Sequence, residues 1–170
     1  MELPGTGYLY TLATVSITFV GFSALLFIYR QTVGGEVTKY DSYFLLSFIQ
    51  AGFIVTGGAL LPPLLALCDL APAEAWRLAS ILAAFPIFLF VATVPGRRHA
   101  AAHERIPRYL VLLLALQGLC AILLVVNAIG RPAVPGPALY AIAITGMLFT
   151  TAIAYLRALA LSMQEPSLRT

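Results

Sequence analysis

Five long uncharged segments constrain this chain more than any other feature. Each contains about 20 or more mostly apolar residues, which is the length a helix needs to cross the hydrocarbon core of a bilayer. A charge at the centre of such a helix costs at least ~2.5 kcal/mol, so stretches this long without Asp, Glu, Lys or Arg are typical of membrane spans. The segments are Leu3–Tyr29, Ser42–Cys68, Leu78–Gly96, Tyr109–Gly130 and Pro132–Leu156.

The composition favours the same class of protein. Of the 170 residues, 61% are hydrophobic and 10% are charged, whereas soluble domains contain about 25% charged residues. We therefore expect an all-α integral membrane protein, with a single transmembrane domain over residues 1–170. The five helices are expected at about 8–29, 42–66, 75–95, 108–129 and 137–160. Because proline removes a backbone donor, Pro62-Pro63 predicts a kink or an early end, Pro86 a kink, and Pro95-Gly96 the end of the third helix.

The basic residues predict the orientation of the bundle. With five spans and the N-terminus outside, only Arg77 and Arg131 would lie on the outer side. The cytoplasmic side would carry Arg30, Lys39, Arg97, Arg98, Arg105, Arg108, Arg157 and Arg169. Cytoplasmic loops carry an excess of Lys and Arg, so this distribution predicts an outer N-terminus and a cytoplasmic C-terminus. Nine of the ten basic residues are Arg, and Ala and Leu dominate the composition. This usage suggests a GC-rich bacterial genome, and we expect the bacterial inner (plasma) membrane as the location.

Small residues recur along two of the expected helices at spacings that place them on one face. The sets are Gly7, Thr11, Thr14, Thr18 and Gly21, and Gly146, Thr150, Ala154, Ala158 and Ser162. Small residues allow helix backbones to approach closely in lipid. The residues expected to serve helix packing are Gly21, Gly57, Gly58, Gly146 and Ala154. Alternatively one stripe lines a pore or a subunit interface, and the stripe on the first helix is the better pore candidate because it is rich in hydroxyl groups.

A layer of neutral polar residues is expected in the inner half of the bundle. Gln50 and Gln117 each lie eight or nine residues from the start of their helices, or roughly 12–14 Å deep at ~1.5 Å per residue. Ser23, Thr150 and Thr151 are expected at a similar depth. Amides are poorly solvated by lipid, so these side chains either bond between helices or surround a constriction. With Thr11, Thr14 and Thr18 they are the candidate pore residues.

Other classes of function find little support. No Asp, Glu, Lys, Arg or His lies in the expected spans, which argues against a proton relay, a voltage sensor or intramembrane catalysis. His99 and His103 are weak candidates for a metal site because a site needs further ligands. A solvated basic loop is the alternative. We expect no enzyme activity, no cofactor, no nucleic-acid partner, and no disulfide between Cys68 and Cys120, which should lie at different depths.

The sequence leaves three functional hypotheses open. The first is a homo-oligomeric channel or permeation protein for small ions or neutral solutes, because a single five-helix bundle is too small for a wide aqueous path. Its cytoplasmic mouth would be basic, with Arg97, Arg98, Arg105 and Arg108. The second hypothesis is a structural or accessory subunit of a larger membrane complex. The third is a membrane protein that binds a ligand or a metal. Apart from the lipid bilayer and further copies of the chain, the pattern identifies no partner, and it does not identify the permeant species.

Overall fold

The computed structural model describes residues 3–32, 39–102, 107–130 and 135–164, and these residues form five helices and no strand. The helices are α1 (Thr6–Thr32), α2 (Lys39–Ala66), α3 (Pro72–Ala102), α4 (Arg108–Ile129) and α5 (Pro137–Gln164). By length and composition, all five are long and apolar enough to cross a membrane. The chain is therefore a helical bundle with five candidate membrane spans.

The third helix does not end where its sequence predicts. Pro95 and Gly96 lie inside α3, which continues to Ala102. Val94 and Arg98, on either side of this pair, are both buried against neighbouring helices. These tertiary contacts hold the backbone in the helix although proline removes one hydrogen-bond donor. The consequence is that Arg97 and Arg98 lie on helix α3, within a candidate span, and not in a loop.

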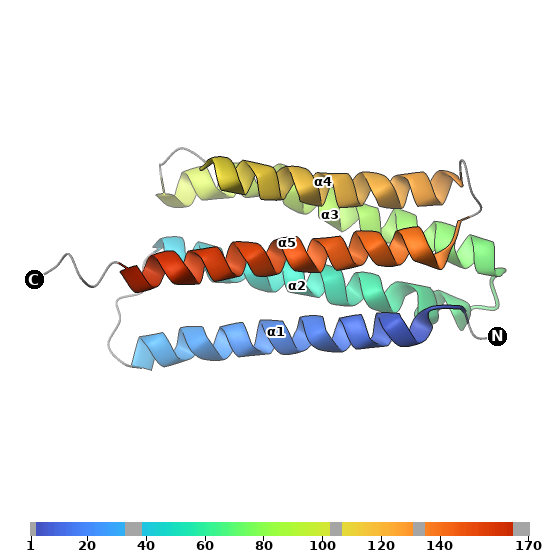
Figure 1. Cartoon of the computed structure of the whole chain (residues 1–170), viewed down its shortest axis with the longest axis horizontal. Coiled ribbons are helices and arrows are strands. Elements are labelled where there is room, and N and C mark those ends of the chain that lie inside the picture. Colours follow the sequence, from blue (N-terminus) through green and yellow to red (C-terminus); the bar gives the residue numbers. More distant parts are fainter. Residues whose placement is uncertain (1–2, 33–38, 103–106, 131–134, 165–170) are drawn as a thin grey trace, which may run out of the picture.

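The helices run alternately up and down, and each one packs against the next along the chain (Figure 1). An additional contact between α2 and α5 closes α2–α5 into a four-helix bundle, and α1 lies at its side against α2. At one end of the molecule lie the last turns of α1, α3 and α5 and the first turns of α2 and α4. We call it the basic end, because its described residues include Arg97, Arg98, Arg108 and Arg157. The opposite end is called the Trp76 end.

Glycines mark three of the closest contacts between helices. A Cβ at Gly52 of α2 would overlap a γ-methyl group of Val20 on α1. A Cβ at Gly58 would lie 2.9 Å from Cδ1 of Ile144, and one at Gly146 would lie 2.9 Å from Sγ of Cys120. Gly58 and Gly146, expected from the sequence to serve packing, thus lie where α5 meets α2 and α4.

The prolines of α2 are accommodated within the helix, which continues past them to Ala66. Pro62 has no N–H to donate to the carbonyl of Gly58, the acceptor four residues earlier. The hydroxyl of Tyr140 on α5 donates to this carbonyl at 2.5 Å. A buried tyrosine from another helix therefore replaces the hydrogen bond that the proline removes, and it ties α5 to α2.

A second polar cluster joins the helices at the Trp76 end. Asn127 donates from Nδ2 to Oγ of Ser80 at 2.9 Å, and its Oδ1 accepts from the backbone N–H of Gly136 at 3.1 Å. The Ser80 hydroxyl donates in turn to the carbonyl of Trp76 at 2.7 Å. Each side-chain polar group in this series of hydrogen bonds has a protein partner. We therefore infer that the cluster holds α3, α4 and the start of α5 together.

Candidate functional site

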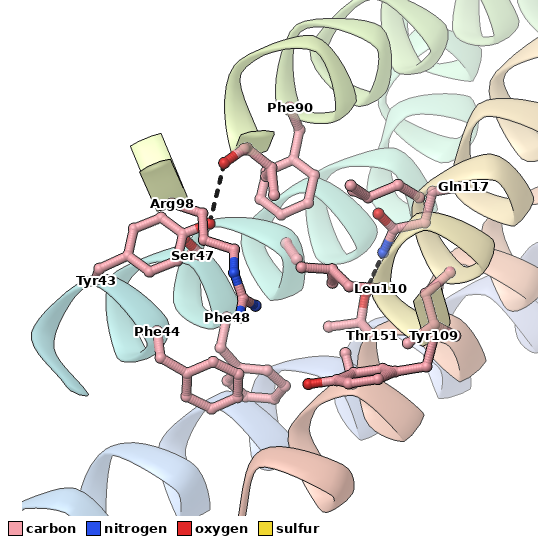
Figure 2. Close-up of a pocket in the computed structure, with 15 residues that line it drawn as sticks. Tyr43, Phe44, Ser47, Phe48, Phe90, Arg98, Tyr109, Leu110, Gln117 and Thr151 are labelled. Atoms are coloured by element: carbon pink, nitrogen blue, oxygen red, sulfur yellow. Dashed lines mark hydrogen bonds between the residues drawn. The ribbon is translucent and has the colours of Figure 1, made fainter. Parts of the chain in front are cut away.

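A cavity of about 70 Å³ lies inside the four-helix bundle, toward the basic end (Figure 2). Residues of α2, α3, α4 and α5 line it. On α4 the lining runs from Tyr109 to Gln117, which is about 12 Å along a helix axis. Its walls are mainly apolar, and five of the lining residues are aromatic: Tyr43, Phe44, Phe48, Phe90 and Tyr109. The polar groups on its surface therefore decide what it can hold.

The cavity contains one arginine. Arg98 is 7% exposed, and Figure 2 shows its guanidinium among the lining side chains. It reaches this position because α3 continues through Pro95 and Gly96, so Arg98 extends the buried face of Phe90 and Val94. A guanidinium stays charged in proteins and offers only donors. The site therefore presents a positive charge within a mostly apolar wall.

Gln117 lies deeper in the same cavity, and its amide orientation follows from its neighbour. The single hydroxyl proton of Thr151 is donated to the carbonyl of Met147 at 2.8 Å. Toward Gln117 the Thr151 oxygen can then only accept, so it faces Nε2, at 3.5 Å. The other amide atom, Oε1, is buried without a hydrogen-bond partner among the described residues. Gln117 is only 4% exposed, and it therefore carries a buried, unsatisfied acceptor next to the cavity that its side chain lines.

Ser47 on α2 brings a second unsatisfied polar group. Its Oγ is buried and has no hydrogen-bond partner in the described part of the chain. A hydroxyl can donate and accept at once, so Ser47 can complement either kind of group. The Tyr43 hydroxyl, by contrast, donates to the carbonyl of Val94 at 3.2 Å. The polar side chains that line this cavity thus differ in capacity: among them, Arg98 carries only donors, and the Ser47 hydroxyl can both donate and accept.

Gln50 belongs to a separate cluster between α2 and α3. Its Oε1 accepts from Nη1 of Arg97 at 2.6 Å, and Nη2 of Arg97 donates to Oγ1 of Thr93 at 2.9 Å. The guanidinium carbon also lies 5.8 Å from the centroid of the Phe90 ring. The expected polar layer therefore forms two separate clusters. Gln50 is hydrogen-bonded to Arg97, whereas Gln117 is hydrogen-bonded to Thr151.

The remaining candidate pore residues do not meet at the cavity. Ser23 is buried, and its hydroxyl donates to the carbonyl of Phe19 on its own helix at 2.7 Å. Thr150 is also buried and bonds to Gly146 and Met147 on α5. The first-helix stripe lies on the exposed side of α1, away from the bundle, and consists of Gly7, Thr11, Thr14, Thr18 and Gly21. Only Gln117 and Thr151 of the predicted layer line the cavity.

The residues expected to serve helix packing fall into two groups, one inside the bundle and one on its surface. Gly58 and Gly146 make the close contacts described above, and Ala154 lines the cavity. Gly21 and Gly57 are exposed, and a Cβ at either position would meet nothing within 4 Å. Hence the two exposed glycines contribute no close contact inside one molecule.

The candidate metal ligands do not form a site in the described structure. His99 is exposed near the end of α3, whereas His103 and Arg105 lie outside the described residues. Arg108 is exposed in the first turn of α4. No group of three or more His, Cys, Asp or Glu side chains gathers among the residues described. Cys68 and Cys120 are both free.

Sequence reasoning missed Arg98 as an internal residue. It assigned the arginine to a loop because a proline and a glycine precede it. The spacing of Ala83, Ile87, Phe90, Val94 and Arg98 by three or four residues repeats the helical period. All five are buried, so Arg98 continues the inner face of α3. The period alone does not show which face of the helix turns inward, because the outer face is equally apolar.

Comparison with known proteins adds no relative: the chain matches no family model, no curated protein and no solved structure. The function is therefore argued from the cavity and its side chains.

Proposed function

We propose that this chain is a membrane protein that binds a small anion in the cavity at its basic end. The observation that carries the proposal is Arg98, whose charged side chain is 7% exposed and lines a cavity of about 70 Å³. A positive charge held in apolar surroundings interacts strongly with an anion, because little water screens the pair. An anion is thus the ligand that best complements the site.

The surroundings of the cavity support this charge preference. The exposed guanidinium of Arg157 on α5 lies 5.1 Å from the ring centroid of Tyr109, which lines the cavity. Arg108 precedes Tyr109 on α4, and Arg97 precedes Arg98 on α3. Basic groups gathered at one end raise the local concentration of anions. Approach from the basic end would therefore be favoured electrostatically.

The volume restricts the ligand to a few heavy atoms. An engineered apolar cavity of about 150 Å³ accepts benzene, and the present cavity is half that size. A ring compound or a whole amphiphile would require the helices to separate. A small oxyanion, or the anionic head of a larger molecule, fits without that change.

In the proposed arrangement the five helices cross the bilayer with the basic end in the cytoplasm. Four arginines of the described residues lie at that end, and the positive-inside rule favours it. The cavity would then open toward cytoplasmic anions. We propose the bacterial inner membrane as the location, on the basis of composition alone.

A homo-oligomeric permeation protein is the second candidate. It is favoured by the exposed stripe of Thr11, Thr14 and Thr18 on α1. Hydroxyl groups at the centre of an outward face could line a path only if several copies placed their α1 helices around a common axis. Flux of small ions into liposomes containing the purified protein, compared with empty liposomes, tests this candidate.

Anion binding is tested on purified protein in phosphatidylcholine nanodiscs. Calorimetric titration with inorganic phosphate should give saturable binding to the wild type, and Arg98→Gln should weaken it at least about tenfold, because a hydrogen bond to a charged group contributes ~1.5–3 kcal/mol. Arg108→Gln is the matched control, since it removes the same charge from an exposed position at the same end. Equal weakening in both variants, or no binding to the wild type, would contradict the proposal.

A further inference from the structure

We infer that the outer surface of α2 and α3 docks a membrane helix of a different protein, and that this helix carries an acidic residue inside the bilayer. We call this region the Arg97 surface, and it is formed by Gln50 of α2 and by Thr93 and Arg97 of α3. The cavity is not involved, and only the proposed crossing of the bilayer by the five helices is required. Arg97 lies within a candidate span, where a charge is costly unless a counter-charge or water accompanies it.

The Arg97 side chain turns toward the middle of the span. Nη1 donates to Oε1 of Gln50 at 2.6 Å, and Nη2 donates to Oγ1 of Thr93 at 2.9 Å. The guanidinium carbon lies 5.8 Å from the centroid of the Phe90 ring. Thr93 and Phe90 precede Arg97 on α3 by about 6 and 10 Å along the helix axis, away from the basic end where α3 finishes. The charge is thus held inside the span, although arginines near helix ends commonly extend to the membrane surface.

The depth of this charge decides which kind of anion can meet it. Gln50 lies about 6 Å from the middle of the candidate span Ser42–Ala66, and Thr93 about 10 Å from the middle of Pro72–Ala100. Half the hydrocarbon core measures about 15 Å, so lipid phosphates and fatty-acid carboxylates lie nearer the membrane surface. The guanidinium would have to leave Gln50 and Thr93 to reach them. A carboxylate carried on a membrane helix matches the charge where it is held.

This chain has no acidic residue of its own at that depth. Gln50 and Thr93, the hydrogen-bond partners of Arg97 among the described residues, are both neutral. The candidate spans contain one acid, Glu74, which lies in the first turn of α3 at the opposite end. Asp41 precedes Gln50 on α2 and lies about 13 Å nearer the basic end. A second copy brings the same spans, so the carboxylate has to come from a different protein.

The Arg97 surface is accessible to such a helix. Both hydrogen bonds of Arg97 are only partly buried, and the Thr93 hydroxyl also forms an exposed bond to its own helix. The apolar residues one turn from Gln50 and Thr93 are more than half exposed: Leu46, Phe53 and Leu89. Gly57, two turns from Gln50 on the same face of α2, is exposed, and a Cβ there would meet nothing within 4 Å. An exposed glycine beside apolar side chains allows another helix to approach closely in lipid.

The inference is tested with a synthetic single-span helix of Leu and Ala that carries one Glu level with Gln50 and Thr93, and with its Gln analogue. Energy transfer from a fluorophore on exposed Cys68 of the full-length protein measures association in phosphatidylcholine liposomes at mildly alkaline pH. The Glu peptide should bind at least about tenfold more tightly than the Gln peptide, because coupling between close charge pairs at protein interfaces is at least of this size. Equal binding of the two peptides to the wild type overturns the inference.

Substitution of the arginine connects this preference to the Arg97 surface. Arg97→Gln should abolish the difference between the Glu and Gln peptides, and Arg97→Lys should retain most of it because the charge remains. Arg108→Gln is the matched control, since it removes an exposed charge at the same end and should leave the preference unchanged. A preference that persists in Arg97→Gln, or that Arg108→Gln removes equally, contradicts docking at this surface.

A second pair of variants keeps the test decisive if Arg97→Gln does not assemble. Gly57→Leu adds bulk in open space on the Arg97 surface and should weaken binding of the Glu peptide at least about tenfold. Gly21→Leu makes the same change at an exposed position of α1, where a Cβ would also meet nothing within 4 Å, and should leave binding unchanged. Equal binding in the two glycine variants overturns the inference.

Oleate separates a helix from a free amphiphile as the source of the carboxylate. At equal mole fraction in the liposomes, oleate should not displace the Glu peptide, because its carboxylate lies nearer the membrane surface than the guanidinium. Displacement by oleate that depends on Arg97 would assign the surface to a fatty acid and overturn the assignment to a membrane helix.

Discussion

At the scale of single residues, the bundle depends on polar groups that complete one another across helices. Pro62 leaves the carbonyl of Gly58 without its usual helical donor, and Tyr140 supplies a hydroxyl from α5. Both Tyr140 and Pro62 are fully buried, so no water can replace the missing donor. The proline and the tyrosine therefore act as a pair, although 78 positions separate them in the chain.

This pairing gives a double-mutant prediction. Tyr140→Phe leaves the Gly58 carbonyl unsatisfied and should destabilise the protein by ~1–3 kcal/mol. Pro62→Ala restores an N–H to that carbonyl, so Tyr140→Phe should cost less in the Pro62→Ala background. Unfolding of the four variants in mixed detergent micelles measures both costs. The same loss in both backgrounds would show that Tyr140 stabilises α5 by other contacts.

At the scale of the helices, close packing is concentrated at a few glycines. Gly146 brings α5 against α4 so closely that a Cβ would lie 2.9 Å from Sγ of Cys120. Gly57 on α2 is exposed and has free space around its Cα. The rings of Phe19, Phe48 and Tyr155 add contacts between α1, α2 and α5, with centroids 4.5 to 5.5 Å apart. Phe48 also lines the cavity, so this aromatic cluster stabilises one wall of the cavity.

Substitutions at two glycines test whether α4 and α5 are in close contact. Gly146→Leu forces α4 and α5 apart and should destabilise the bundle by ~1–3 kcal/mol or prevent assembly, as overpacking of a filled interface does. Gly57→Leu places the same side chain in open space and should leave thermal stability nearly unchanged. Yield, size-exclusion profile and melting temperature of both variants provide the measurement. Similar profiles for the two variants would mean that the α4–α5 contact is not close in the folded protein.

At the scale of the whole molecule, the basic end combines the cavity with most of the described arginines. In the proposed orientation, those arginines both direct insertion and attract the ligand. The two roles require the same charges on the same side. The location of the cavity within the bundle and the orientation of the bundle in the bilayer are therefore linked, and a test of one bears on the other.

Reporter fusions test the orientation. A reporter that functions only in the cytoplasm should be active when inserted after Gly35, after Ala101 or after Thr170, and inactive when inserted at Pro72 or Pro135. The reason is the excess of Lys and Arg in the segments assigned to the cytoplasm. Activity at Pro135 would contradict the arrangement of five spans with an outer N-terminus, and it would place the basic end on the opposite side from the proposed ligand.

The sequence by itself determined that the chain forms five long apolar helices, because length and hydropathy are local properties. The expected 108–129 helix corresponds to α4, Arg108–Ile129. The tertiary structure alone decided which faces turn inward. It placed Thr11, Thr14 and Thr18 outside, and Arg98 inside. In a bundle whose outer surface is as apolar as its core, hydrophobic periodicity does not distinguish the two faces, so only contacts between distant segments could bring Arg98 and Gln117 to one cavity.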